Sequence, residues 1–346
     1  MRKALSLKLI NCQLSIGKLR INSQDSSSLK TFAMLNKLRI NLSSVFGLLL
    51  LVLSLWAIAN ELHEYNYHDV LKSLAAIPKS RLSWAIWLTA LGYLVMIGYD
   101  ILGFSYVSRS LAWNKIALTN FISSVFSNTI GFALLTGSAI RYRFYASWGV
   151  SALAIAQVIA FANFTFWLGM FAVAGFLFIT NPLKIPTQLH LPFIDVRPIG
   201  IIFILLVAAY LLASILIKQP LTIRGQEFRF PSLKISIAQI VVSSFDWILA
   251  AAVLYIVLPN KIPLSFLDFL GIYLLAMFAG VISNVPGGLG VFETVILLIL
   301  SSKVSAAAIL GSMLAYRGIY YFLPLLLAAG LLGLYELRYG TRKLTK

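Results

Sequence analysis

The sequence has few charged residues for its length. Charged side chains make up 11% of the 346 residues, whereas soluble globular domains carry roughly 25%. Hydrophobic residues make up 60%, and the mean hydropathy is +0.90. This composition excludes an ordinary soluble domain and predicts an all-α polytopic integral membrane protein.

Cysteine, histidine and the common enzyme motifs are also scarce or missing. The single cysteine, Cys12, excludes an internal disulfide, an iron–sulfur cluster and a cysteine-based metal site. The three histidines lie outside the apolar stretches. Walker A, HExxH and GxSxG sequences are absent. We therefore expect that the chain is not an enzyme and binds no cofactor and no metal.

Acidic residues are outnumbered: 28 Lys and Arg face 11 Asp and Glu, a net charge of +17. Basic loops are an orientation signal in membrane proteins, so we expect no nucleic-acid partner. Residues 1–42 are predicted to form a basic cytoplasmic tail without the apolar core of a cleaved signal peptide. Met34 is an alternative start of translation. Residues 339–346 form a second basic tail.

The apolar stretches predict about six full crossings, because a spanning helix needs ~20 apolar residues. The predicted spans are 43–60, 82–107, 149–180, 198–217, 235–258 and 304–337. Two further apolar regions, 116–140 and 266–301, are interrupted by Gly, Asn and Pro. We predict that both are re-entrant broken-helix hairpins, which enter the membrane and return to the same side.

The distribution of basic residues supports this count. Six crossings with the N-terminus inside place both termini in the cytoplasm, together with residues 107–147 and 218–234. These cytoplasmic segments hold 20 of the 28 basic residues, as the positive-inside rule requires. The agreement fails if either interrupted region crosses the membrane fully.

The chain also repeats a pattern. "SNTIG" at 127–131 matches "SNVPGG" at 283–288, and "SWGVSALAI" at 147–155 matches "SSKVSAAAI" at 301–309. Each unit consists of a helix with an acidic residue, a broken hairpin and a helix of about thirty residues. Three crossings separate the units, which predicts an inverted repeat, the arrangement with which many transporters build a substrate site.

The hairpin turns are the first candidate site. Non-helical backbone at membrane depth is tolerated only where protein buries it or water lines it. The predicted turn residues are Pro286, Gly287, Gly288 and Gly290 in the second hairpin and Gly131 in the first. Glu293, one turn later, could cap the freed amides or meet a cationic headgroup. The alternative is a structural turn with Glu293 facing water.

Polar residues in the helices and hairpins supply further candidates. A carboxylate at a helix centre costs about 2.5–3.5 kcal/mol on insertion scales, which favours a cavity or a partner for Asp246. Asp100 could instead lie at the cytoplasmic interface. Asn128 and Asn284 occupy equivalent places in the repeat, where they could either bond the broken backbone or contact substrate.

Arg317 interrupts the last long helix, and Tyr320 and Tyr321 share its face. Arginine can hold a phosphate with two parallel N–H groups, so Arg317 could bind a lipid phosphate. It could equally pair with Glu293 or Asp246. Arg141, with nearby aromatic residues, is explained either by anchoring at the inner interface or by phosphate binding.

Four motifs together resemble a known family. They are "YDI" at 99–101, "FISSVFSNTIGF" with "RYRFY" within 121–145, "NVPGGLGVFE" at 284–293 and "YRGIYYFLP" at 316–324. In this order they resemble the membrane domain of lysylphosphatidylglycerol synthase/flippase proteins, the multiple peptide resistance factors, and their stand-alone bacterial relatives. The resemblance covers about residues 43–338. The chain ends at Lys346, so the soluble aminoacyl-transfer domain of the two-part members is expected to be absent.

The resemblance implies a flippase-like protein of the bacterial inner membrane that moves a polar or aminoacylated phospholipid between leaflets. The alternative is a membrane subunit of a lipid-headgroup-modifying synthase or glycosyltransferase. The expected partner is a membrane phospholipid. A separate lipid-modifying enzyme and a second copy of the chain are further candidate partners.

Overall fold

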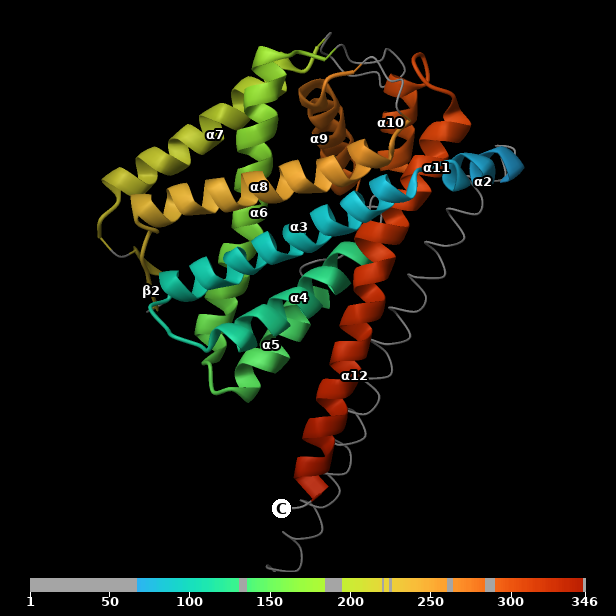
Figure 1. Cartoon of the computed structure of the whole chain (residues 1–346). Helices are drawn as coiled ribbons and strands as arrows, with labels where there is room; N and C mark the ends of the chain where they lie inside the picture. The colour runs from blue at the N-terminus through green and yellow to red at the C-terminus, as the bar shows by residue number, and fades with distance from the viewer. Residues whose placement is uncertain are drawn as a thin grey trace, which may run out of the picture. The chain divides into compact units, whose positions relative to one another are not determined.

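The computed structural model of the protein describes residues 67–130, 136–183, 195–219, 221–223, 226–259, 264–283 and 290–344. The predicted tail 1–42, the first predicted span 43–60 and the hairpin turns lie outside these ranges. Within them the chain is mainly helical (Figure 1).

Five helices in the described part are long and apolar enough to cross a membrane, and each coincides with a predicted span. They are α3 (Lys79–Tyr106), α6 (Ala152–Thr180), α7 (Arg197–Leu216), α8 (Leu233–Val257) and the continuous segment Ala306–Tyr335. Large apolar side chains on their outer faces are exposed, for example Leu205, Leu216 and Leu326. Such faces suit a lipid environment, where no hydrophobic force favours burying them. The prediction of a polytopic membrane protein is confirmed.

Both interrupted regions form pairs of packed helices. The first consists of α4 (Trp113–Ile130) and α5 (Thr136–Ser147), and the second of α9 (Phe266–Ile282) and α10 (Val291–Leu300). At 1.5 Å per residue, the 12 residues of α5 and the 10 residues of α10 reach only about 18 and 15 Å. The hydrocarbon core is about 30 Å thick. These lengths agree with hairpins that do not cross the membrane.

The order of elements repeats as the sequence predicted. A long helix, a hairpin and another long helix occur first as α3, α4, α5 and α6, and then as α8, α9, α10 and the helix that begins with α11 (Ala306–Tyr316). Ser151 and Ser305, which the repeat aligns, both stand at the N-cap of the last helix. The two first helices, α3 and α8, pack against each other along their lengths (Figure 1). The repeat therefore brings its two acidic helices together.

The last long helix is not a regular α-helix. After α11 a π-helical segment, η3 (Arg317–Phe322), leads into α12 (Leu323–Leu344). Pro324 has no N–H and its ring crowds the carbonyl four residues earlier, which is that of Tyr320. The Tyr93 hydroxyl of α3 donates to this carbonyl at 3.1 Å. The π-helical turn thus ends just before Pro324, and α12 continues through most of the predicted tail 339–346.

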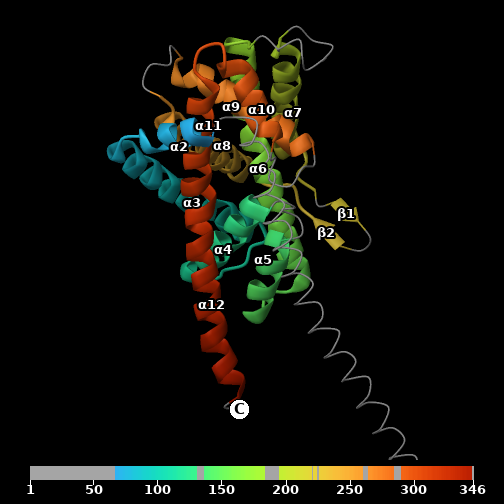
Figure 2. The ribbon, with the colours of Figure 1, turned by 90° about the vertical axis from the view of Figure 1, so that its right-hand side faces the viewer.

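One short helix and one pair of short strands were not predicted. α2 (Tyr67–Ala75) precedes α3. β1 (Leu221–Ile223) and β2 (Gln226–Phe228) pair antiparallel, with Leu221 opposite Phe228, within the predicted 218–234 loop (Figure 2). The all-α expectation therefore needs this one correction. The ribbon links α7 and α8 and does not contribute to the site described below.

Packing of α6 on α8 depends on a glycine. A side-chain carbon on Gly169 would overlap the backbone and side chain of Ser243. We expect Gly169→Ala to lower the free energy of unfolding by about 1–3 kcal/mol, the usual cost of overpacking. The control is Gly330→Ala on α12, where nothing lies within 4 Å of an added carbon, so helix propensity should raise stability by up to about 1 kcal/mol. Thermal unfolding in detergent measures both, and a Gly169→Ala variant as stable as the control would contradict this prediction.

Candidate functional site

The start of α10 fixes Glu293. Gly290, the residue before the helix, has φ = +78°, which is the left-handed region that glycine adopts without strain. Its N–H donates to Oε2 of Glu293 at 2.9 Å, so the carboxylate caps the first turn. The predicted capping role is confirmed. The alternative, a carboxylate facing water, is wrong because Glu293 is buried.

Arg317 pairs with the same carboxylate. Its Nε donates to Oε1 of Glu293 at 2.8 Å, and its Nη2 donates to the same oxygen. The guanidinium carbon also lies 5.7 Å from the ring centre of Tyr321. Of the two partners that the sequence offered, Glu293 and Asp246, the structure selects Glu293. The two side chains keep 12% and 10% of their surface exposed, against 8% and 0% for Arg141 and Asp100, so this is the less enclosed of the two pairs.

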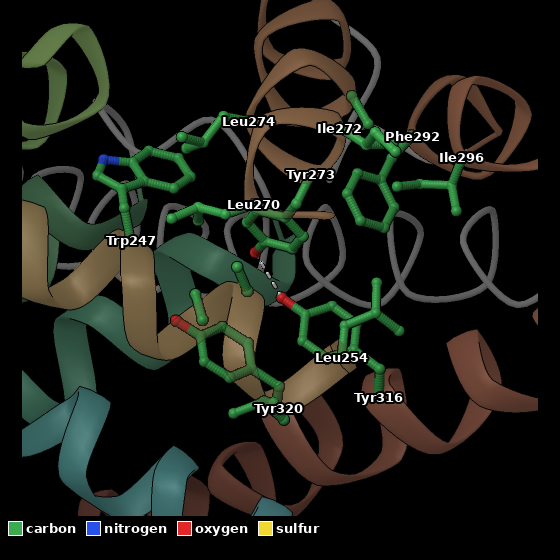
Figure 3. Close-up of a cluster of buried hydrophobic side chains, with 14 of the residues drawn as sticks. Trp247, Leu254, Leu270, Ile272, Tyr273, Leu274, Phe292, Ile296, Tyr316 and Tyr320 are labelled. Atoms are coloured by element: carbon green, nitrogen blue, oxygen red, sulfur yellow. Dashed lines mark hydrogen bonds between the residues drawn. The ribbon is translucent and has the colours of Figure 1, made fainter. Parts of the chain in front are cut away.

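A group of tyrosines surrounds the π-helical turn that begins with Arg317, and Figure 3 shows Tyr273, Tyr316 and Tyr320 of this group. The hydroxyls of Tyr273 on α9 and Tyr316 on α11 are 2.8 Å apart and hydrogen-bonded. Tyr316 stacks on Tyr320 with ring centres 5.3 Å apart, and Tyr320 packs edge-on against Tyr321 at 5.2 Å. The sequence analysis named Tyr320 and Tyr321 but missed Tyr273 and Tyr316. The available signal was a phenol inside an apolar helix, where a buried hydroxyl needs a partner.

Asp246 lies in the interior between the two repeats. Its Oδ2 accepts the hydroxyl of Tyr99, which comes from α3, at 2.7 Å. Its Oδ1 has no hydrogen-bond partner, and only 3% of the residue is exposed. No basic side chain among the described residues forms an ion pair with it. Asp246 has a partner, one of the two environments that the sequence favoured, but the partner is Tyr99 rather than Arg317.

The other helix-borne carboxylate, Asp100, forms a closed ion pair. Nε of Arg141 on α5 donates to its two oxygens at 3.1 and 3.0 Å, and the Tyr145 hydroxyl donates to Oδ2 at 2.5 Å. Asp100 is fully buried, and Arg141 is only 7% exposed. Asp100 is therefore held by partners inside the protein. Arg141 does not anchor the chain to lipid headgroups in this structure, because its charge is neutralised inside the protein.

The first hairpin carries a polar face, of which only Asn128 was predicted from the sequence. Its residues follow helical spacing along α4: Asn120, Ser123, Ser124, Ser127 and Asn128. Arg141 donates to Ser124 at 3.4 Å, and Ser127 lies directly against Gly137 of α5. The paired positions show that α4 and α5 run antiparallel. The amide of Asn128 makes a weak contact at 4.0 Å with the sulfur of Met96 on α3.

The remaining predicted site residues belong to the hairpin turns. They are Gly131, Asn284, Pro286, Gly287 and Gly288, and they lie outside the described residues. Within the described ranges, no three His, Cys, Asp or Glu side chains are grouped as a metal site would need.

The site residues form two ion pairs that differ in how far they are exposed. One pair, Asp100 with Arg141, is buried, and its carboxylate accepts from Arg141 and Tyr145. The other, Glu293 with Arg317, lies at the start of a short hairpin helix, keeps about a tenth of its surface exposed and is bordered by phenol groups. Buried pairs become costly when one partner is removed, but a partly exposed pair can exchange its partner for a charged ligand.

This fold and site define a polytopic membrane protein built from a repeated helix–hairpin–helix unit. The family described as the lysylphosphatidylglycerol synthase TM region matches residues 42–328. The chain belongs to this family.

Relatives of two sizes match the chain. The protein slr0712 of Synechocystis sp. is 48% identical over 294 residues, covering 85% of this chain and 91% of that protein. The inner membrane protein YbhN of Escherichia coli is 31% identical over 265 residues, covering 76% and 82%. Phosphatidylglycerol lysyltransferase of Staphylococcus xylosus is 25% identical over 311 residues, which are 88% of this chain but 35% of the enzyme. The chain thus spans most of the first two proteins and about a third of the lysyltransferase.

Proposed function

We propose that the protein moves a polar or aminoacylated phospholipid between the leaflets of a membrane. The observation that carries the proposal is the partly exposed ion pair of Glu293 and Arg317 at the start of α10. A lipid headgroup that enters the site breaks the contact between Glu293 and Arg317 and takes the place of one partner for each side chain. Arg317 takes the phosphate with two parallel N–H groups, and Glu293 takes a cationic group of the headgroup or returns to capping α10.

The neighbouring phenols complete the headgroup site. Tyr320 and Tyr321 follow Arg317 on the π-helical turn, and Tyr321 lies beside the guanidinium. Phenol hydroxyls donate hydrogen bonds to phosphate oxygens, and their rings pack against glycerol and acyl carbons. The buried pair of Asp100 and Arg141 instead has a structural role, because it links α3 to α5.

Family membership supports a lipid as cargo. The staphylococcal relatives are phosphatidylglycerol lysyltransferases by name, and their shared part is the membrane region. YbhN is an inner membrane protein, and we place this chain in a bacterial inner membrane with both termini in the cytoplasm. The sequence has no nucleotide-binding loop, so lipid movement is proposed to be downhill or ion-coupled.

Reconstitution tests the proposal. Purified full-length protein is placed in liposomes that contain acyl-chain-labelled phosphatidylglycerol or lysylphosphatidylglycerol, and the outer leaflet is quenched from outside. We expect the protected inner pool to become quenchable much faster than in protein-free liposomes. Rates equal to those of protein-free liposomes for both lipids would refute the proposal.

The named alternative is a membrane subunit for a separate headgroup-modifying enzyme. The lysyltransferase relatives favour it, since this chain matches only about a third of their length. It requires that deletion of the gene changes the total amounts of lipids. A change confined to the distribution between leaflets supports translocation instead.

A further inference from the structure

Asp246 differs from the other two candidate carboxylates. Asp100 and Glu293 each hold an arginine. Asp246 has one hydrogen bond, from Tyr99, and its Oδ1 has no partner. A buried carboxylate charge without a cation costs several kcal/mol, so the carboxyl group must be neutral in this conformation. A neutral carboxyl group carries a proton.

The groups that face Asp246 are neutral phenols. Tyr99 and Tyr93 come from α3, Tyr273 from α9 and Tyr320 from η3, and all four lie close enough to interact with its charge. Among the other packed elements, α6 carries no titratable side chain. The titratable groups of the remaining elements are already engaged: Tyr316 of α11 bonds Tyr273, and Tyr210 of α7 bonds Gln239.

The side chains packed around Asp246 leave room for no cation larger than a proton. Asp246 is 3% exposed, and its neighbours Tyr93, Tyr99, Trp247 and Tyr320 are themselves buried. A lipid ammonium group or a hydrated metal ion needs space beside the carboxylate. A proton needs none, because it bonds directly to Oδ1.

The polar face of α4 comes close to Tyr93, a neighbour of this carboxyl group. Several side-chain atoms of the first hairpin are buried without a partner, and each of them can donate a hydrogen bond: Thr119 Oγ1, Asn120 Nδ2, Ser127 Oγ, Thr129 Oγ1 and Ser138 Oγ. A buried unpaired donor costs about 1–3 kcal/mol, and buried water is the usual partner in such places. Asn128, on the same face of α4, lies close to the Tyr93 hydroxyl, and Tyr93 lies near Asp246.

We propose that Asp246 is a proton-binding site, reached through water along the polar face of α4, and that its protonation is coupled to lipid movement. A proton from water binds Oδ1 and makes the carboxyl group neutral, which permits the closed packing described above. When the site opens, the same proton returns to water and leaves the carboxylate ionised. The proton-binding site stands on its own observations, whereas the coupling rests on the proposed function.

Infrared difference spectroscopy tests the site without lipid transport. The full-length protein should show the C=O stretching band of a protonated carboxylic acid near neutral pH, and the isosteric Asp246→Asn variant should lose it. Asp268→Asn is the matched control, because Asp268 is half-exposed at the start of α9, where it bonds Ser265, and its replacement should leave the band unchanged. A band that is absent from the wild type, or that survives in Asp246→Asn, would overturn the assignment.

Liposomes with a pH gradient test the coupling. For one proton per lipid, each unit of pH gradient should shift the leaflet ratio of labelled phosphatidylglycerol by up to about tenfold, and Asp246→Asn should abolish this shift. Lipid movement by the wild type that ignores the gradient would overturn the coupling and leave the proposed function standing. A wild type that moves no lipid refutes the proposed function and the coupling together, and the infrared band still decides the proton site.

Discussion

The Arg317→Ala variant is expected to move no more phospholipid than protein-free liposomes and to lose about 3–5 kcal/mol of unfolding free energy. Both effects follow from one contact. Arg317 balances the charge of Glu293, which is otherwise buried and caps α10, and it is also the proposed ligand of the lipid phosphate. Liposome quenching measures the transport rate, and denaturant titration in detergent measures stability.

A neutral pair separates the two roles. In the double variant Glu293→Gln/Arg317→Gln no charge is buried, so most of the stability should return, as it does when both partners of a buried pair are replaced. Transport should remain at background, because the phosphate has lost its guanidinium. If this double variant moved lipid at the wild-type rate, Arg317 would have only a structural role.

The Asp100→Ala variant is expected to be the most damaging change at the contact between α3 and the first hairpin, at about 3–5 kcal/mol. It leaves Arg141 charged and buried, and among the described residues only the 3.4 Å bond to Ser124 then remains to it; it also removes the acceptor of the Tyr145 hydroxyl. The thermal midpoint in detergent should fall, and transport should be lost with the fold.

The double variant Asp100→Asn/Arg141→Met is the matched control. Asparagine still accepts from Tyr145, methionine fills the space of the arginine stem, and no charge is left unpaired. We expect stability within about 1–2 kcal/mol of the wild type and lipid movement at a comparable rate. A stable double variant without transport would show that this pair takes part in lipid movement and does not have a structural role alone.

The spans and the hairpins could be predicted because their signals are local. Five predicted spans coincide with α3, α6, α7, α8 and the helix from Ala306, since ~20 apolar residues suffice to decide a crossing. The Gly, Asn and Pro interruptions separate α4 from α5 and α9 from α10, because glycine and proline weaken a helix wherever they stand. The strand pair 221–223 with 226–228 was missed, as three-residue strands carry little pattern.

The partners of the polar side chains could not be predicted. Asp246 and Tyr99 are 147 residues apart in the chain, and Asp100 and Arg141 are 41 apart. Tyr99 and Asp100 are adjacent on α3. Tyr99 nevertheless donates to Asp246 of α8, whereas Asp100 accepts from Arg141 and Tyr145 of α5. Which one reaches α8 and which accepts from α5 depends on how the helices are rotated against each other, and one sequence does not contain that rotation.

The sequence by itself determined the class of protein, the crossing helices, the breaks in the two hairpins and the resemblance to the family. Only the tertiary structure decided that Glu293 holds Arg317, that Arg141 is sealed against Asp100, and that Asp246 has an oxygen without a partner. Hydropathy and helix breaking are sums over neighbouring residues, so a linear reading captures them. The pairing of charges depends on which helix faces pack together, and that is settled only when the whole chain has folded.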